Sequence, residues 1–580
     1  MVTLWLMFAS AQRASTQPSS AIALTPDQNK AHREITAFFT TPITVAQSTY
    51  LHLLTGGAGS GKTTLTKELI KSARKSGLQV LLVAPTHKAR RVLHNIVNTH
   101  TFLRTPTTTV ASLLGKVRAH SFVGTHNYKK EADSKMGVYD VVFIDEVSMI
   151  TEEDYLDICK LAQVYRKKVL LIGDEAQIPH PASQYIKDPT GHYLEKAISP
   201  AFSLPYVSAL TSTKRTSEQS LVALYDAVRR DIGSDVRFTK YADSISNNVL
   251  TLTDQADVFS GYIEEQFKRN QATNKVICYT NNAVKRYNTL VRQSLGYGPL
   301  QTGEMLMGYT NIGTGGAEFL IENGQDYLVM SVKSVWDHNL CANDKTFEGL
   351  SGIMIKIKPY VASGAVTAPA AASSSDTSAG IFLPDLDEEN NVAVLSELVS
   401  LAQRVNTKGS KPIDYRHYMS LKTQLFFMEH VYQYGEGIYN ESNFKTQHPL
   451  LFTRMADHVS VGEAGSRSII KNETTDRITS IYGAILHERL GDTKEISANE
   501  ELADMYQILE KDFDYGYAIT AHKSQGSTYD RVFIDEANFG SLADGWSAVQ
   551  KLPIRRLGER DRLKYVAVTR ARSHVYILNV

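Results

Sequence analysis

Several features that mark specialised classes of protein are scarce in this sequence. Only three of its 580 residues are cysteines, Cys159, Cys278 and Cys341, and no two of them form a CxxC pair. This pattern predicts buried thiols in a reducing compartment, rather than disulfides, a CxxC zinc site or thiol redox chemistry. Glycine and proline, with 36 and 17 residues, are too few for collagen or a low-complexity polymer.

Long hydrophobic runs are also missing. No stretch reaches the ~18 consecutive apolar residues that a membrane-spanning helix needs. The apolar segment from Val2 to Ala9, followed by Ser10 and Ala11, has the length of a signal-peptide core but no basic segment before it. We therefore expect a cytoplasmic protein that does not enter a membrane, and export by this segment is the alternative.

An excess of charge of one sign is absent as well. The 62 basic and 61 acidic residues leave a net charge of +1, which excludes a uniformly basic nucleic-acid binder. The charges are segregated, however. Residues 550–572 hold eight basic and two acidic side chains, and residues 492–514 hold the reverse. This segregation predicts a local basic track whose binding to nucleic acid depends strongly on salt.

What the sequence does contain is an alternation of short apolar runs and helical patterns, which predicts parallel sheets with crossover helices. The length predicts several domains, and the alternation stops near residue 300 and resumes near 515. The expected strands lie at 50–55, 80–84, 141–144, 169–172, 275–279, 532–534 and 575–578, with helices from Pro26, over 88–97 and over 282–295.

The same pattern predicts the domain organisation of an α/β protein with two insertions. A polar, aromatic-dotted excursion at 115–139 is expected to form a hairpin, and the Ala- and Ser-rich segment 362–380 a mobile loop. The expected units are a tail at 1–23, a first α/β domain at 24–212, a second at 213–300 and 515–580, and a β-rich accessory domain at 301–514.

A complete phosphate-binding motif follows the first expected strand. The sequence G-x-x-x-x-G-K-T, in which Lys62 and Thr63 close the motif, lies between a strand and a helix. Its backbone N–H groups can surround phosphate oxygens, Lys62 can contact the β- and γ-phosphates, and Thr63 can bind Mg²⁺. The predicted ATP-binding residues are Gly56, Gly57, Ala58, Gly59, Ser60, Gly61, Lys62, Thr63 and Thr64.

Two acidic motifs end the next strands and complete the predicted nucleotide site. Asp145 follows a buried strand and can hold Mg²⁺ together with Thr63, while Glu146 can polarise the attacking water. Asp174 and Gln177 follow the next strand and can sense the γ-phosphate. Lys62, Asp145, Glu146 and Gln177 are therefore expected to be catalytic.

The ordered motifs resemble those of superfamily 1 DNA helicases, in particular the 5′-to-3′ branch of RecD-like enzymes and the phage Dda helicase. The resemblance extends over about 24–345 and 515–580, and its motifs are Gln28, Gly56–Thr63, Ala84–Lys88, Asp145–Glu146, Gly173–Gln177, Lys214–Arg215, Ala521–Gly526 and Val568–Arg572. Further Dda-like segments are Leu210–Thr216, Thr280–Lys285, Asn323–Gln325 and Tyr565–Ser573. The resemblance implies two RecA-like P-loop domains and an SH3-like accessory domain.

The resemblance also implies roles for individual residues. Gln28 would read adenine, and Arg215 and Arg570 would be catalytic arginine fingers that approach the γ-phosphate from the second domain. The implied DNA-binding residues are Pro85, Thr86, His87, Lys88, Thr109, His522, Lys523 and Gln525. In the segment after Thr109, Ala111 stands where these helicases usually have histidine.

The hairpin lies where Dda-like helicases carry the element that splits the duplex. Its candidate base-stacking residues are Phe122, His126 and Tyr128, with Lys129 and Lys130 for phosphates. An aromatic side chain that merely anchors the hairpin is the alternative.

The function implied by these motifs is an ATP- and Mg²⁺-dependent DNA helicase that moves 5′ to 3′ along single-stranded DNA. Its partners would be single-stranded DNA and duplex junctions, then single-strand-binding or other replication, recombination or repair proteins. It would act as a monomer in the cytoplasm, that of the host if a phage encodes it. An RNA helicase, the motor subunit of a helicase–nuclease complex and a non-catalytic single-strand-binding protein are the alternatives.

Overall fold

The computed structural model describes the chain with gaps. The described residues are 24–43, 50–98, 105–119, 127–130, 133–180, 185–187, 193–196, 198–212, 218–234, 236–310, 312, 320–335, 340–342, 345–347, 350–360, 379–385, 388–406, 417–418, 420–421, 424–428, 434–435, 438–439, 512–541, 545–547, 552–554 and 557–579. Among them, no helix is long and apolar enough to span a membrane.

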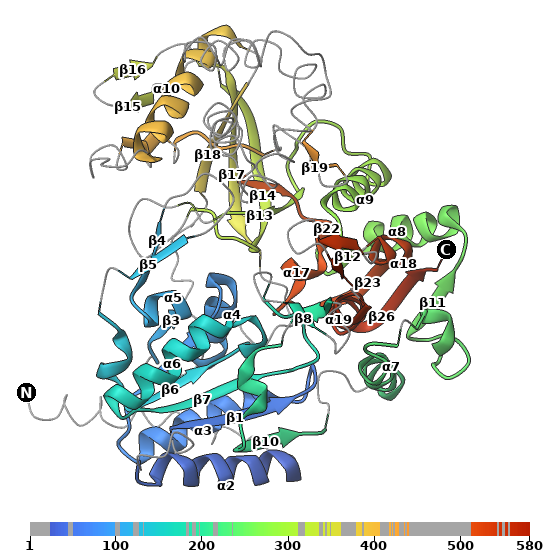
Figure 1. Cartoon of the computed structure of the whole chain (residues 1–580). Helices are drawn as coiled ribbons and strands as arrows, with labels where there is room; N and C mark the ends of the chain where they lie inside the picture. Colours follow the sequence, from blue (N-terminus) through green and yellow to red (C-terminus); the bar gives the residue numbers. More distant parts are fainter. Residues whose placement is uncertain are drawn as a thin grey trace, which may run out of the picture.

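The first sheet is parallel and has the strand order β10-β1-β7-β6-β2-β3 (Figure 1). Alternate residues of its strands enter two cores, as expected for a sheet covered on both faces. Its strands are β1 (Leu51–Gly56), β2 (Val80–Ala84), β3 (Thr107–Thr109), β6 (Val141–Ile144), β7 (Lys168–Gly173) and β10 (Val207–Leu210). Its helices are α2 (Pro26–Thr40), α3 (Lys62–Lys75), α4 (His87–Asn98), α5 (Val110–Leu113) and α6 (Glu152–Tyr165).

The second sheet is also parallel, with the order β11-β26-β23-β12-β22. Because β12 lies between β22 and β23, it pairs with two strands that follow it by about 240 residues or more in the sequence. The strands are β11 (Leu250–Thr253), β12 (Asn274–Cys278), β22 (Ala518–Thr520), β23 (Tyr529–Asp535) and β26 (Ala571–Leu578). The helices are α7 (Gln219–Arg230), α8 (Ala256–Arg269), α9 (Asn281–Ser294), α17 (Ala521–Ser524), α18 (Glu536–Gly540) and α19 (Leu557–Val568). The α/β class with two parallel sheets is thus confirmed.

A third sheet is antiparallel and comes from the chain between the two parts of the second sheet. Its order is β18-β17-β14-β13-β21, and it forms the upper part of the molecule in Figure 1 together with α10 (Glu389–Asn406). The strands are β13 (Met305–Gly308), β14 (Asp326–Val335), β17 (Gly352–Pro359), β18 (Ala379–Pro384) and β21 (Phe513–Tyr515). Short hairpins pair β15 (Leu340–Ala342) with β16 (Lys345–Phe347) and β19 (Tyr434–Gly435) with β20 (Ile438–Tyr439).

Two smaller features lie outside these sheets. An antiparallel hairpin joins β4 (Lys116–Ala119) to β5 (Asn127–Lys130). A small sheet of order β24-β25-β9-β8 combines strands from both α/β units. In it β8 (Tyr185–Lys187) and β9 (Tyr193–Lys196) of the first unit meet β24 (Gly545–Ser547) and β25 (Leu552–Ile554) of the second. This shared sheet was not predicted from the sequence.

Some expectations fall outside the described residues. These are the tail at 1–23, the segment with Lys214 and Arg215, the hairpin tip with Phe122 and His126, and most of the acidic segment 492–514. The loop expected over 362–380 is too long at its end, because Ala379 and Gly380 already belong to β18. Cys159 and Cys278 are buried thiols, as predicted.

Candidate active site

The glycine-rich loop joins β1 to α3 and turns where the motif requires. Gly59 and Gly61 have φ angles of 78° and 81°, which glycine adopts without steric cost. A Cβ on Gly61 would collide with Nε2 of Gln28. The Lys62 ammonium lies over the loop and donates to the carbonyl oxygens of Gly56 (2.7 Å) and Gly57 (3.0 Å). The loop is therefore closely enclosed by its own lysine and by Gln28.

Gln28 is positioned by the start of α2. Thr25 caps this helix, Pro26 occupies its first position, and Gln28 completes a capping box with Thr25. The Gln28 amide is 4% exposed; its Oε1 accepts from the Thr25 N–H at 3.0 Å, and its Nε2 donates to the Ser60 carbonyl at 3.2 Å. Gln28 thus contacts the phosphate loop, while its amide is engaged within the protein.

The acidic pair lies at the end of β6, two strands from the loop in the order β1-β7-β6. Glu146 has a left-handed backbone (φ 53°, ψ 47°), a strained conformation for a residue with a side chain and one often found at functional sites. Desolvation and the Glu146 carboxylate raise the pKa of Asp145 to about 7, although the Glu146 N–H and the Lys62 ammonium oppose this rise. Asp145 therefore interacts electrostatically with both Glu146 and Lys62.

The loop after β7 lies between these two motifs. Asp174 is fully buried, and the Oε1 atom of Gln177 is buried without a hydrogen-bond partner among the described residues. The Ser60 hydroxyl of the phosphate loop is likewise buried without a hydrogen-bond partner among the described residues. Buried polar atoms are normally paired, so these two atoms fit a site whose partner is a polar ligand. The donor set also suits Mg²⁺-ATP, with Thr63 and Asp145 to hold the ion.

The second α/β unit closes this site with two side chains to which the sequence analysis assigned no role. Arg229 of α7 donates to Asp174 Oδ1 at 2.5 Å, and the Tyr565 hydroxyl of α19 donates to Asp174 Oδ2 at 2.9 Å. The same hydroxyl accepts the Ala58 N–H of the phosphate loop at 3.1 Å. The sequence does hint at the position of Arg229, because this arginine directly follows the apolar stripe of α7. The stripe is formed by Leu221, Leu224, Tyr225 and Val228.

Arg570 is buried just after the end of α19. Its guanidinium donates to the carbonyl oxygens of Val566 (3.0 Å) and Ser527 (3.3 Å) and to the Thr569 hydroxyl (2.9 Å), all within the second unit. Burial lowers the pKa of Arg570, and the Glu146 carboxylate of the first unit opposes this. Arg570 therefore lies within electrostatic reach of Glu146, one of the two predicted catalytic acids. Arg215 lies outside the described residues.

The residues expected to bind nucleic acid lie mainly at strand ends. Pro85 and Thr86 follow β2, and the Thr86 hydroxyl accepts the Ala89 N–H at 3.1 Å in the first turn of α4, the helix that holds His87 and Lys88. Thr109 caps α5 and is 8% exposed. Phe122, at the tip of the hairpin, lies outside the described residues.

In the second unit, His522 and Lys523 belong to α17 and Gln525 ends it. Lys523 Nζ donates to Asn323 Oδ1 at 3.1 Å and lies 3.8 Å from the centre of the Tyr309 ring. These two partners belong to the third sheet region, so Lys523 connects the second unit to it.

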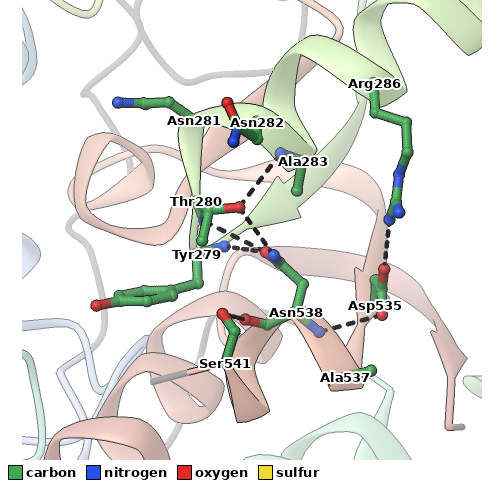
Figure 2. A pocket seen from close by; sticks show the side chains of 10 residues that line it. All are labelled: Tyr279, Thr280, Asn281, Asn282, Ala283, Arg286, Asp535, Ala537, Asn538 and Ser541. Carbon is green, nitrogen blue, oxygen red and sulfur yellow. Dashed lines mark hydrogen bonds and ion pairs between the residues drawn. The ribbon is translucent and has the colours of Figure 1, made fainter. Parts of the chain in front are cut away.

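A pocket of about 850 Å³ opens near the ends of β12 and β23 (Figure 2). Asn538 lies at its centre: its Oδ1 accepts the Tyr279 N–H at 2.7 Å, and its Nδ2 donates to Thr280 Oγ1 at 2.9 Å. Arg286 on its rim pairs with Asp535 at 2.7 Å. None of the lining residues was predicted to bind ATP. In the described part of the chain, no cluster of three or more metal-ligating side chains occurs.

Comparisons with known proteins agree with this architecture. A family profile described as an AAA domain matches residues 24–188. The ATP-dependent RecD2 DNA helicase of Deinococcus radiodurans is 41% identical over 130 residues, which are 22% of this chain and 16% of that protein. The chain thus matches only about a sixth of this relative's length. The uncharacterized protein R530 of Acanthamoeba polyphaga mimivirus is 23% identical over 525 residues, 85% of this chain and 90% of that protein.

Solved structures of Pif1 helicases are similar at a low level. The Bacteroides Pif1 structure bound to ssDNA has 14% identity and a TM-score of 0.42, and covers 96% of this chain and 92% of its own. The Candida albicans Pif1 structure has 13% identity and a TM-score of 0.41, with 96% and 95% covered.

The fold and the phosphate loop define a P-loop nucleotide-binding protein with two RecA-like units. The AAA-domain match over residues 24–188 and the partial similarity to RecD2 agree with the motif set, which resembles that of superfamily 1 helicases of the RecD-like kind.

Proposed function

We propose that this protein is an ATP-dependent DNA helicase that moves along single-stranded DNA, 5′ to 3′, and unwinds duplex DNA. The observation that carries the proposal is the composite site between the two units. Ala58 of the phosphate loop and Asp174 of the loop after β7 bond to Tyr565 and Arg229 of the second unit. A nucleotide at such a junction can change how the two units meet, which is what a motor requires. The name of the RecD2 relative supports DNA as the substrate.

Each part of the site has a task in this proposal. The phosphate loop and Lys62 hold the nucleotide phosphates, and Gln28 helps to select adenine. Mg²⁺, held by Thr63 and Asp145, would supply charge neutralisation at the phosphates. Glu146 orients and deprotonates water, Gln177 senses the γ-phosphate, and Arg215 and Arg570 approach it from the second unit.

The strand would cross the ends of β2, β3 and β22. Thr86 and Thr109 lie on the first unit and His522, Lys523 and Gln525 on the second, so the proposed contacts are divided between the two units. The domain boundaries given above, with 301–514 as accessory domain and the β4–β5 hairpin as the element that splits the duplex, belong to the same proposal. So do a monomeric state, a cytoplasmic location and a role in replication, recombination or repair.

The test is the phosphate release of the full chain with and without poly-dT, followed by unwinding of duplexes that carry a 5′ or a 3′ single-stranded tail. We expect hydrolysis that DNA stimulates and a preference for the 5′ tail. Glu146→Gln should keep nucleotide binding and lose turnover. Stimulation by poly-U alone would indicate an RNA helicase, and absence of any hydrolysis would refute the proposal in favour of passive single-strand binding.

A further inference from the structure

The junction between the two units contains a connected group of four residues. The Tyr565 hydroxyl accepts the Ala58 N–H at 3.1 Å and donates to Asp174 at 2.9 Å, and Arg229 donates both to Asp174 at 2.5 Å and to the Tyr565 oxygen at 3.3 Å. Asp174 is 0% exposed and the Arg229 side chain 27%. The four residues come from the phosphate loop, the loop after β7, α7 and α19.

The sequence around this group leaves room for it. A Cβ on Gly57 would lie 3.2 Å from Arg229 Nη1 and 3.6 Å from the Tyr565 hydroxyl, so the second glycine of the loop admits both side chains. Ala58, Ala176 and Ile178 of the first unit also belong to the hydrophobic core of the second, with Leu221 and Tyr565. The polar contacts therefore lie beside a packed apolar junction, where an unpaired partner would be costly.

The protonation states match the contacts. Burial and the Asp174 carboxylate raise the pKa of Tyr565 to about 12, although Arg229 and the Ala58 N–H oppose this rise. The phenol is consequently protonated at neutral pH and can donate to Asp174 while it accepts from the loop. Burial opposes the charge of Arg229, but Asp174 and Tyr565 raise its pKa. Asp174 thus serves as the shared acceptor of both side chains.

We infer that Arg229 and Tyr565 are positioning residues that clamp the second unit onto the phosphate loop through Asp174 and the Ala58 N–H. The clamp rests on the proposed function, because its purpose is to convert the state of the phosphate site into a defined placement of the second unit. Ala58 belongs to the loop that holds the nucleotide, and Asp174 begins the loop that contains Gln177. The loops that follow β1 and β7, which would contact the nucleotide, are thereby connected to α7 and α19.

The first test is kinetic and uses Tyr565→Phe, which removes one oxygen, and Arg229→Ala. We expect kcat for strand-stimulated ATP hydrolysis to fall about tenfold to thirtyfold, while KM for ATP stays within about twofold because the nucleotide contacts remain. Arg229→Lys should restore part of kcat. The double variant should lose less than the sum of the single effects, since both residues act through Asp174.

Matched controls come from the same helices and core. Tyr225→Phe removes a buried hydroxyl that donates to the Ala571 carbonyl at 2.6 Å within the second unit, and Arg230→Ala removes the exposed neighbour of Arg229. Both should keep kcat. If Tyr225→Phe lowers kcat as much as Tyr565→Phe, loss of core packing explains both, and the inference is wrong.

The second test does not depend on activity. Spin labels on Lys71→Cys of α3 and Lys268→Cys of α8, both more than half exposed, report the distance between the units in a Cys341→Ser background. Tyr565→Phe and Arg229→Ala should broaden the distance distribution, and the two controls should not. An unchanged distribution in both clamp variants would overturn the inference. If the distributions broaden as expected but the wild-type protein hydrolyses no ATP, the proposed function is refuted. The clamp then remains as a contact between the units.

Discussion

The root of the β4–β5 hairpin offers the sharpest single prediction, because one lysine attaches it to the first unit. Lys116 Nζ lies 2.8 Å from Asp154, 2.9 Å from Asp157 and 3.2 Å from Glu153, all on α6, and the lysine side chain is 12% exposed. Thr151 caps this helix, and acidic residues in a first turn are favourable there. Removal of Lys116 should therefore release the hairpin without unfolding α6.

The magnitude follows from the exposure of the three acids. Glu153 is 82% and Asp157 43% exposed, so water and salt screen both contacts and they add little. The contact with Asp154, 27% exposed, is the main one, and a hydrogen bond between charged groups in such a place contributes about 2 kcal/mol. Lys116→Ala should then make opening of the hairpin root about thirtyfold more frequent.

Amide hydrogen exchange over β4 measures this opening directly. Lys135→Ala is the control, because Lys135 donates to the nearby Ser112 hydroxyl at 2.9 Å in an exposed contact and, among the described residues, forms no ion pair with α6. Burial lowers the pKa of Lys116, but the three acids raise it by more, so the net shift is upward. The stabilisation by this contact is therefore fully present below the pKa of an unfolded lysine, about 10.4, and is lost only at higher pH. The effect should therefore be constant from about pH 6 to 9. In the helicase assay, Lys116→Ala should keep strand-stimulated hydrolysis and lose unwinding. Unchanged exchange in β4, or equal loss of both activities, would refute this reasoning.

Three further predictions concern the nucleotide site. Gly61→Ala should abolish ATP binding, because a Cβ there displaces the Gln28 amide, whereas Gly77→Ala, with a similar φ of 79° and open space around it, should cost only backbone strain; equal ATP affinity of the two variants in calorimetry would contradict this. Since the pKa of Asp145 is raised to about 7, its carboxylate is lost as the pH falls below that value, and Mg²⁺-dependent ATP binding should weaken from pH 8 to 6; Asp145→Asn should bind more weakly throughout, with no such slope. Arg570→Ala should keep ATP affinity and lose most turnover in a phosphate-release assay, and retained turnover would remove Arg570 from the proposed mechanism.

The local half of the site could be predicted from the sequence because short-range rules determine it. Strands β2 and β6 have the bounds expected from their apolar runs, and the loop before Lys62 has the left-handed glycines that its motif requires. In a parallel sheet the chain leaves every strand at the same edge, so Asp145 and Asp174 were expected near the phosphate loop. The structure has them at the ends of neighbouring strands.

The other half could not be predicted in this way because its contacts span most of the chain. Ala58 and Tyr565 are 507 residues apart, and Asp174 and Tyr565 are 391 apart. No periodicity links such positions, and a tyrosine on a buried helix and an arginine on an amphipathic one ordinarily anchor a core or form a surface ion pair. The shared sheet of β9 and β25 was missed for the same reason.

The difference between Tyr565 and Arg570 shows how the phosphate site of the first unit and the residues of the second unit could work together. Both belong to the closing Tyr565–Ser573 motif, yet Tyr565 bonds across the junction while Arg570 bonds within its own unit. For Arg570 to approach a phosphate, it must exchange hydrogen bonds to Val566, Ser527 and Thr569, each worth about 1 kcal/mol net, for contacts with an anion. Because burial lowers its pKa and Glu146 is the charge that opposes this, a developing negative charge beside Glu146 would favour that exchange. Such an arginine would engage only when the clamp holds the second unit close and the phosphate site carries charge, so hydrolysis would depend on the placement of both units.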